Sequence, residues 1–125
     1  MESEYAKYEI EDGLLFCFYK PGFVIDLAVA KSVVADRHRF SKGKCYAVVI
    51  DCRNLKVITK EAREYLSTYD GVRGIKSSAF IVKGNIQKLL INFFVRVHKP
   101  ALPLKVFTGM DEAVSWIRRG AMVMH

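Results

Sequence analysis

The chain has 125 residues, of which 51% are hydrophobic and 26% charged, and its 20 Lys and Arg against 13 Asp and Glu give a formal net charge of +7. This composition excludes a disordered chain, and the length fits one domain over residues 1–125. The longest charge-free apolar stretches, Gly13–Tyr19 and Leu89–Val95, are much shorter than the roughly 20 residues of a membrane helix. Residues 1–12 are rich in carboxylates and lack the positive start of a signal peptide. We therefore expect a cytoplasmic protein with no membrane span.

The first predicted elements are two strands, Tyr5–Glu11 and Leu14–Tyr19, on either side of Asp12-Gly13. Asp-Gly between two strand-like runs is the strongest short-range signal of a hairpin. Pro21-Gly22 ends the second strand, because proline has no N–H to donate to a sheet. The sequence therefore predicts an antiparallel hairpin at the N-terminus.

A helix is predicted over Leu27–Phe40, with Asp26 as its N-cap and Gly43 at its end. The apolar residues on its expected inner face are Leu27, Ala30, Val33 and Val34. The segment Tyr46–Asp51 is apolar until its last residue and β-branched in its middle. That pattern is typical of a central strand covered on both faces.

A second helix is predicted to begin after Thr59 and to end at Asp70-Gly71. Its apolar residues recur at the spacing of one helical face, namely Ala62, Tyr65, Leu66 and Tyr69. Two further strands, Ser78–Lys83 and Leu104–Thr108, and a last helix, Asp111–Arg119, follow.

The segment Asn85–Lys99 is compatible with both a helix and a strand, but its length and Asn85 as an N-cap favour a helix. The element order is then ββαβαβαβα. Strands that alternate with helices after a hairpin predict an α/β fold. We expect a four- to five-stranded, mostly parallel sheet with an antiparallel N-terminal hairpin and helices covering it.

Candidate catalytic residues are Asp51 and Cys52, because ligands of open α/β sheets bind at the carboxyl ends of the strands. The neighbouring Arg53 or a helix N-terminus could activate the thiol. However, the sequence has no nucleophile elbow, Walker A motif or Rossmann glycine pattern. A lone carboxylate at a strand end is more often a turn or cap residue, so we predict no enzyme and no catalytic residue.

The chain has three cysteines, Cys17, Cys45 and Cys52, and no two of them form a C-x-x-C motif. It has only three histidines. A metal site needs clustered thiols and imidazoles, so we predict no metal and no cofactor. All three thiols are expected to be buried and to act as small hydrophobic side chains.

Nucleic-acid binding is a less favoured alternative, suggested by residues 63–125, which hold 10 basic and 4 acidic side chains. The run Gly71–Gly74 matches the G-x-x-G clamp of KH domains. In KH domains that loop joins two helices, whereas the strand-like Ala79–Val82 follows it here. A glycine-containing turn from helix to strand is the favoured interpretation.

A protein interface is predicted on the helix over residues 85–99, where Ile91 and Val95 fall outside the core stripe. The candidate interface residues are Ile91, Phe94, Val95 and Arg96. Together with the apolar tail over residues 121–124, they predict a homodimer; residues 1–4 and 120–125 are expected to be frayed or interface tails. The alternative is intramolecular: the helix is buried on two sides, and the tail packs on its own sheet edge.

The ββαβαβαβα order resembles the STAS-type fold of anti-sigma-factor antagonists and their SpoIIAA-like relatives. The strand Ala47–Asp51, the helix start Ile58–Ala62 and the ending Lys105–Phe107 with Asp111–Ile117 carry the resemblance. The ending is similar to the acidic–acidic–Ala–x–x–Trp–aliphatic last helix of SpoIIAA-like bacterial proteins. The resemblance implies a non-enzymatic regulatory or protein-interaction module with an unknown protein partner.

Phospho-switched STAS proteins carry an Asp-Ser-Ser/Thr-Gly motif at the start of the helix after the third strand. Here Thr59 stands at the Asp position, Lys60 and Glu61 at the hydroxyl positions and Ala62 at the glycine. Glu61 offers a fixed negative charge that cannot be switched. The sequence therefore predicts a module without the usual phospho-acceptor, and its candidate switch or ligand region consists of Asp51, Cys52, Thr59 and Glu61.

An alternative function is the binding of a small apolar or anionic amphiphilic ligand, such as a lipid, between the sheet and residues 85–99. SpoIIAA-like folds resemble lipid-carrier domains in their layout. In this alternative Lys88, Arg96 and Lys99 surround an anionic head group.

Overall fold

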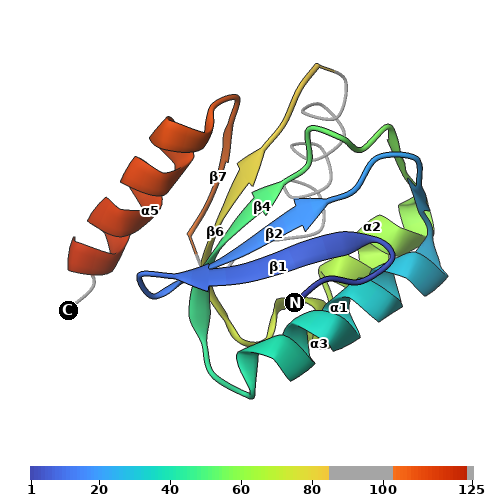
Figure 1. The fold of residues 1–125 in the computed structure, drawn as a ribbon, viewed down its shortest axis with the longest axis horizontal. Coiled ribbons are helices and arrows are strands. Elements are labelled where there is room, and N and C mark those ends of the chain that lie inside the picture. Colours follow the sequence, from blue (N-terminus) through green and yellow to red (C-terminus); the bar gives the residue numbers. More distant parts are fainter. Residues whose placement is uncertain (85–102, 124–125) are drawn as a thin grey trace.

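The computed structural model describes residues 1–84 and 103–123, with side chains up to residue 120, and it contains a five-stranded sheet between two layers of helices (Figure 1). The strands, in sheet order, are β1 (Ala6–Glu11), β2 (Leu14–Tyr19), β4 (Tyr46–Asp51), β6 (Ile75–Ile81) and β7 (Leu104–Phe107). β1 is antiparallel to β2, and every other pair is parallel. This mixed sheet confirms the predicted fold class.

The helices divide between the two faces of the sheet (Figure 1). One face is covered by α1 (Leu27–Ser41), α2 (Lys60–Leu66) and α3 (Tyr69–Val72), and the other by α5 (Met110–Val123). The helix predicted over residues 85–99 lies outside the described residues.

The N-terminal hairpin turns at Asp12 and Gly13, which have φ of 50° and 80°. Positive φ at both central residues is the signature of a type I′ turn, which matches the twist of the paired strands. The two strands pair from Ala6↔Tyr19 to Glu11↔Leu14, so the hairpin prediction is confirmed.

The first helix begins and ends close to its predicted bounds. The side chain of Asp26 accepts a hydrogen bond from the Val29 amide at 2.9 Å, and the helix ends where Lys42 turns into the left-handed region. Three of the four predicted inner residues are buried, but Leu27 is 37% exposed. Leu27 is the first residue of the helix and directly follows the exposed N-cap Asp26.

The predicted helix from Thr59 to Asp70 is broken into α2 and α3. The hydroxyls of Ser67 and Thr68 bond to the carbonyls of Glu64 and Tyr65 at 2.8 and 2.6 Å. Such side-chain bonds to the backbone compete with helix continuation. As a result Tyr69 is 77% exposed, and its predicted place in the core is wrong.

Candidate functional site

The carboxyl ends of β2 and β4 lead into a small second sheet that the sequence did not predict. It consists of β3 (Val24–Ile25) and β5 (Val57–Ile58), which run parallel with Val24 opposite Val57. Strands of two residues are too short to show an alternating pattern in a sequence. The sheet nevertheless determines which side chains face solvent at this end of the molecule.

Successive side chains of a strand point to opposite faces, and β3 and β5 follow this rule in register. Ile25 and Ile58 are buried in the core cluster beneath α1, whereas Val24 and Val57 are 53% and 46% exposed. Leu27, which begins α1 two residues after β3, is exposed as well. We call Val24, Leu27 and Val57 the tip patch. Val24 and Val57 lie side by side on paired strands, and adjoining exposed apolar side chains mark interaction sites more often than isolated ones do.

Thr59 and Glu61 follow β5 directly and therefore lie beside the tip patch. The Thr59 hydroxyl accepts a hydrogen bond from the Ala62 amide at 3.2 Å, and the Thr59 amide donates to the Ile25 carbonyl at 3.0 Å. Thr59 is thus the N-cap of α2, as predicted, and it ties the helix to β3. Glu61 is exposed in the first helical turn, where a negative charge is favourable.

Asp51, at the end of β4, is fully engaged by its neighbour Arg53. The Asp51 carboxylate accepts bonds from the Arg53 amide at 3.0 Å, from Nε at 3.0 Å and from Nη2 at 2.7 Å. Burial alone would raise the pKa of Asp51, but the hydrogen bonds and charge of Arg53 outweigh it and hold that pKa below its ordinary value. The arrangement suits a paired carboxylate in a turn and not a general base.

The thiol of Cys52 is equally unsuited to nucleophilic chemistry. Cys52 is 2% exposed, and burial raises the pKa of its thiol well above the ordinary value. Burial likewise raises the pKa of Cys17 to about 12. A neutral buried thiol is inert because the thiolate is the nucleophile. Cys45 is exposed in the surface loop before β4, so the prediction that all three thiols are buried is wrong for this one.

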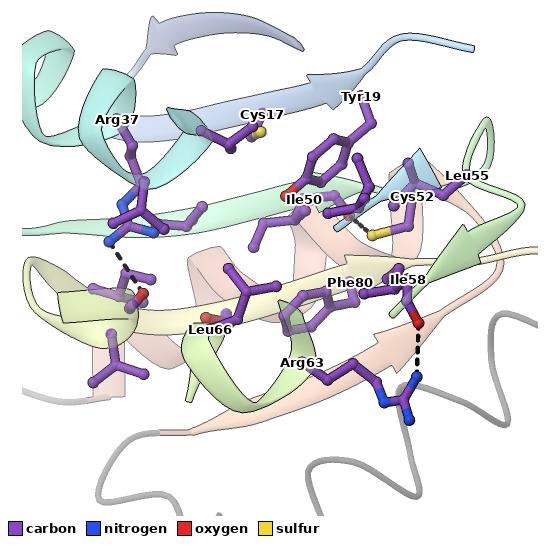
Figure 2. Close-up of a pocket in the computed structure, with 18 of the residues that line it drawn as sticks. Cys17, Tyr19, Arg37, Ile50, Cys52, Leu55, Ile58, Arg63, Leu66 and Phe80 are labelled. Atoms are coloured by element: carbon purple, nitrogen blue, oxygen red, sulfur yellow. Dashed lines mark hydrogen bonds between the residues drawn. The ribbon is translucent and has the colours of Figure 1, made fainter. Parts of the chain in front are cut away.

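A cavity of about 70 Å³ lies between the sheet and the layer formed by α1, α2 and α3 (Figure 2). Two polar residues that the sequence analysis missed, Arg37 and Tyr19, line it, and they are only 9% and 8% exposed. Arg37 continues the buried stripe of α1, seven residues after Ala30 and three after Val34. This spacing indicated that Arg37 lies on the buried face of the helix. Its positive charge instead suggested a position on the solvent-facing side.

A second, open hollow of about 560 Å³ lies at the opposite end of the sheet, near the start of β4. Its apolar lining residues include Ile10, Phe40 and Tyr46, and its basic ones are Arg39, Lys42 and Lys44. These cations come from the half of the chain with the smaller positive balance. Basic residues of the described part of the chain therefore also gather outside its more basic second half.

Within the described ranges, no three His, Cys, Asp or Glu side chains come together as a metal site. None of the helices in the described part of the chain is long and apolar enough to cross a membrane. The candidate interface residues Ile91, Phe94, Val95 and Arg96 lie outside the described residues. The structure brings Thr59 and Glu61 together beside the tip patch, with Asp51 and Cys52 at the neighbouring strand end.

Comparison with known proteins places this geometry in a fold and a family. The chain is similar to the crystal structure of an uncharacterised protein of the DUF3478 family with a SpoIIAA-like fold from Shewanella loihica PV-4, at 15% identity and a TM-score of 0.63 over 94% of this chain and 98% of that one. The fold is therefore SpoIIAA-like. No curated protein sequence matches the chain. A family model described as a domain of unknown function, DUF7793, matches residues 8–120, so the chain belongs to the DUF7793 family.

Proposed function

We propose that this protein is a non-enzymatic regulatory module that binds a protein partner through the tip patch. The observation that carries the proposal is the pair Val24 and Val57, which lie directly opposite each other and are both about half exposed. Because each side chain is already about half buried, covering its remaining exposed surface stabilises an interface by roughly 1 kcal/mol, about half of the value for full burial. Apolar side chains held on paired strands are pre-positioned, so little conformational entropy is lost when a partner covers them.

The surroundings of the patch support binding without chemistry. The two candidate catalytic residues are Asp51 and Cys52. The carboxylate of Asp51 is paired with Arg53, and the thiol of Cys52 is buried. The Thr59 hydroxyl caps α2, and Glu61 supplies a permanent charge where related proteins carry a phosphate. We therefore propose that partner binding is constitutive and is not controlled by phosphorylation at this helix start.

The partner that fits this surface has an apolar centre and a polar rim. Lys56 and Lys60 lie on either side of β5, and Asp26 and Glu61 provide the opposite charge nearby; all four are exposed. A rim with both signs steers orientation more than it adds affinity. Val24, Val57 and Leu27, once covered by the partner, would then supply most of the binding free energy.

The test is a double substitution, Val24→Asp with Val57→Asp, which places two charges in the proposed interface without touching the buried Ile25 and Ile58. The matched control is Ile10→Asp, which charges an exposed apolar residue of β1 that is 41% exposed. Quantitative recovery of the partner from a lysate of the native host should fall at least about tenfold for the double variant, since each 1.4 kcal/mol lost is tenfold in affinity. It should stay unchanged for the control. Equal recovery by the double variant and the wild type, with both folded, contradicts the proposal.

Absence of catalysis is tested separately, on the purified wild type. Panels of esterase, phosphatase and nucleotide substrates should give no turnover above background. Turnover that disappears in Asp51→Ala or Cys52→Ala would contradict the non-enzymatic proposal.

The amphiphile alternative places its ligand between the sheet and residues 85–99, which lie outside the described residues. The cavity of about 70 Å³ beneath α1–α3 is well below the roughly 300–1,000 Å³ of ordinary ligand pockets, so it does not hold a lipid chain. Native mass spectrometry of protein taken directly from the expression host decides, and a ligand-free mass argues against this alternative. Nucleic-acid binding is tested by a gel-shift experiment with DNA and RNA. The absence of a band shift at low salt argues against this function.

The homodimer stays a prediction, because Ile91, Val95 and the apolar tail lie outside the described side chains. Light scattering of the wild type and of an Ile91→Glu/Val95→Glu variant tests it. A dimer that the two charges dissociate without unfolding would locate the interface, whereas a monomeric wild type at tens of micromolar would refute it.

A further inference from the structure

The cavity beneath α1–α3 contains a buried positive charge that is not neutralised by a carboxylate among the described residues. Arg37 is 9% exposed. Its Nη2 donates to the carbonyls of Gly71 and Arg73 at 3.1 and 3.2 Å, at the end of α3. These bonds orient the guanidinium but leave its charge uncompensated, and Nε and Nη1 donate to no acceptor among the described residues. Buried charges in proteins are normally paired.

The same cavity contains a buried hydroxyl that makes no hydrogen bond to the described part of the chain. Tyr19 is 8% exposed, and its ring extends from β2 toward the middle of the lining residues, near Ile50 (Figure 2). The other buried tyrosine on this face, Tyr8, donates to the Val33 carbonyl at 3.1 Å. Buried hydroxyls are almost always hydrogen-bonded, so the Tyr19 hydroxyl calls for an acceptor or donor inside the cavity.

The remaining wall is largely apolar, apart from Tyr8, Arg63 and Ser78, and the space is small. Ile50, Leu55 and Phe80 contribute to the lining together with Cys17 and Cys52, whose thiols are neutral. The volume of about 70 Å³ is about half of the roughly 150 Å³ that holds a benzene molecule in an engineered cavity. It is also about twice the roughly 30 Å³ that one water occupies in the liquid. The space therefore suits an organic molecule of a few non-hydrogen atoms.

We propose that this cavity binds a small aliphatic carboxylate of two to four carbons. The carboxylate pairs with the guanidinium of Arg37, an oxygen of the same ligand accepts a hydrogen bond from the Tyr19 hydroxyl, and the carbon atoms contact the apolar wall. A ligand of this class supplies the missing negative charge and the missing acceptor together. An arginine suits this role because its planar fork matches a carboxylate. The site is separate from the tip patch. Its test does not depend on whether a protein partner binds there.

The experiment compares acetate, propionate, butyrate, lactate and pyruvate, each as its sodium salt against sodium chloride of equal ionic strength. Thermal unfolding and amide NMR shifts are measured on the full chain. We expect the carboxylates to raise the Tm at millimolar concentration and to shift the amide signals around Tyr19 and Arg37. Propionamide, which has a similar shape and no charge, should have no effect.

Three variants separate the contributions of the two polar groups and of the volume. Tyr19→Phe removes one hydroxyl and should weaken binding about two- to twelvefold, the effect of one hydrogen bond. Arg37→Gln removes the charge and should abolish binding. Val48→Ile adds one methyl group to the lining and should weaken butyrate more than acetate.

The NMR titration decides even if Arg37→Gln does not fold, because Tyr19→Phe and Val48→Ile leave the bonds of Arg37 to α3 intact. Carboxylate affinity that falls in both of these variants supports the site. Absence of any carboxylate effect on the folded wild type overturns it and leaves a cavity that holds water only. Carboxylate binding that is equally strong in the wild type and in Tyr19→Phe and Val48→Ile also overturns it.

Discussion

The two faces of the central sheet differ in chemistry although they are built from the same strands. The face beneath α5 is mainly apolar: the buried members of its core cluster are Leu14, Phe16, Ala47, Val49, Ala79, Ile81, Ala113 and Ile117, and the buried Ser77, opposite Ala47, adds one hydroxyl. The face beneath α1–α3 holds more of the buried polar groups, among them Tyr8, Cys17, Tyr19, Arg37, Cys52 and Ser78, and the cavity between them. We infer that the α5 face serves stability and the α1–α3 face serves binding.

Strand alternation is the reason that neighbours in the sequence divide so cleanly. In β2, Phe16 belongs to the α5 face, whereas Cys17 and Tyr19 belong to the other. The buried sides of β3 and β5 join the same core cluster as Cys17 and Tyr19. The tip patch therefore lies on the outer side of the strands whose inner side joins the α1–α3 face, and substitutions on the two faces of the central sheet should have different effects.

The largest effect is expected on the α5 face. Ile117→Ala removes a side chain that is 1% exposed and should lower the free energy of unfolding by about 2–5 kcal/mol, the cost of a large-to-small change in a packed core. Urea unfolding measures it. The partly buried Val114 of the same helix provides a milder control as Val114→Ala. A loss below about 1 kcal/mol for Ile117→Ala would show that α5 is not part of a packed core.

An intermediate effect is expected at alkaline pH, and it comes from the α1–α3 face. The folded pKa of Cys17 is about 12, whereas a thiol in the unfolded chain has a pKa of about 8.5. Between these values only the unfolded state loses the proton, so stability is full below the unfolded pKa and falls as pH rises above it. The expected loss is about 1.4 kcal/mol per pH unit for each such thiol.

Urea unfolding between neutral pH and about pH 10 measures this slope. Cys17→Ala should reduce the slope, whereas Ile117→Ala should shift the whole curve downward and leave the slope unchanged. An identical slope in the wild type and Cys17→Ala would contradict the account of this face.

The smallest effect is expected at the paired Asp51. Its folded pKa is lowered, so the pair with Arg53 contributes stability above the unfolded pKa of about 3.9, and this contribution is lost as pH falls through the folded pKa. Arg53 is exposed, with 42% of its side-chain surface accessible, so Arg53→Ala should cost less than about 1 kcal/mol at neutral pH. The difference from the wild type should vanish in acid, and NMR titration should show a higher pKa for Asp51 in the variant. A difference that persists in acid would mean that Arg53 acts through packing.

Much of the fold was predictable because its signals are local. The Asp12-Gly13 turn and the caps at Asp26 and Thr59 each depend on a few neighbouring residues. The order of strands and helices along the chain was enough to predict a mostly parallel sheet. The break between α2 and α3 was missed because the hydroxyls of Ser67 and Thr68 competed with an otherwise regular helical period. Two-residue strands such as β3 and β5 carry no period at all.

The candidate site was predictable only in part. The strand end at Asp51 and the cap at Thr59 were located correctly, and the engagement of Asp51 by a residue two positions away is a local feature. The unpaired state of Tyr19 and Arg37 is different, because it depends on which groups from distant elements surround them. The exposure of the tip patch depends in the same way on the pairing of segments 33 residues apart in register, Val24 with Val57.

The most direct test of the central claim, that the protein acts by binding a partner at the tip patch, is site-specific photo-crosslinking in the native host. A photoreactive amino acid is placed at Val57 in one variant and at Ile10, an exposed apolar position on β1, in another. We predict a crosslinked product of one defined mass from position 57 and none from position 10. The same product from both positions, or none from position 57 in a folded and expressed protein, would contradict the claim.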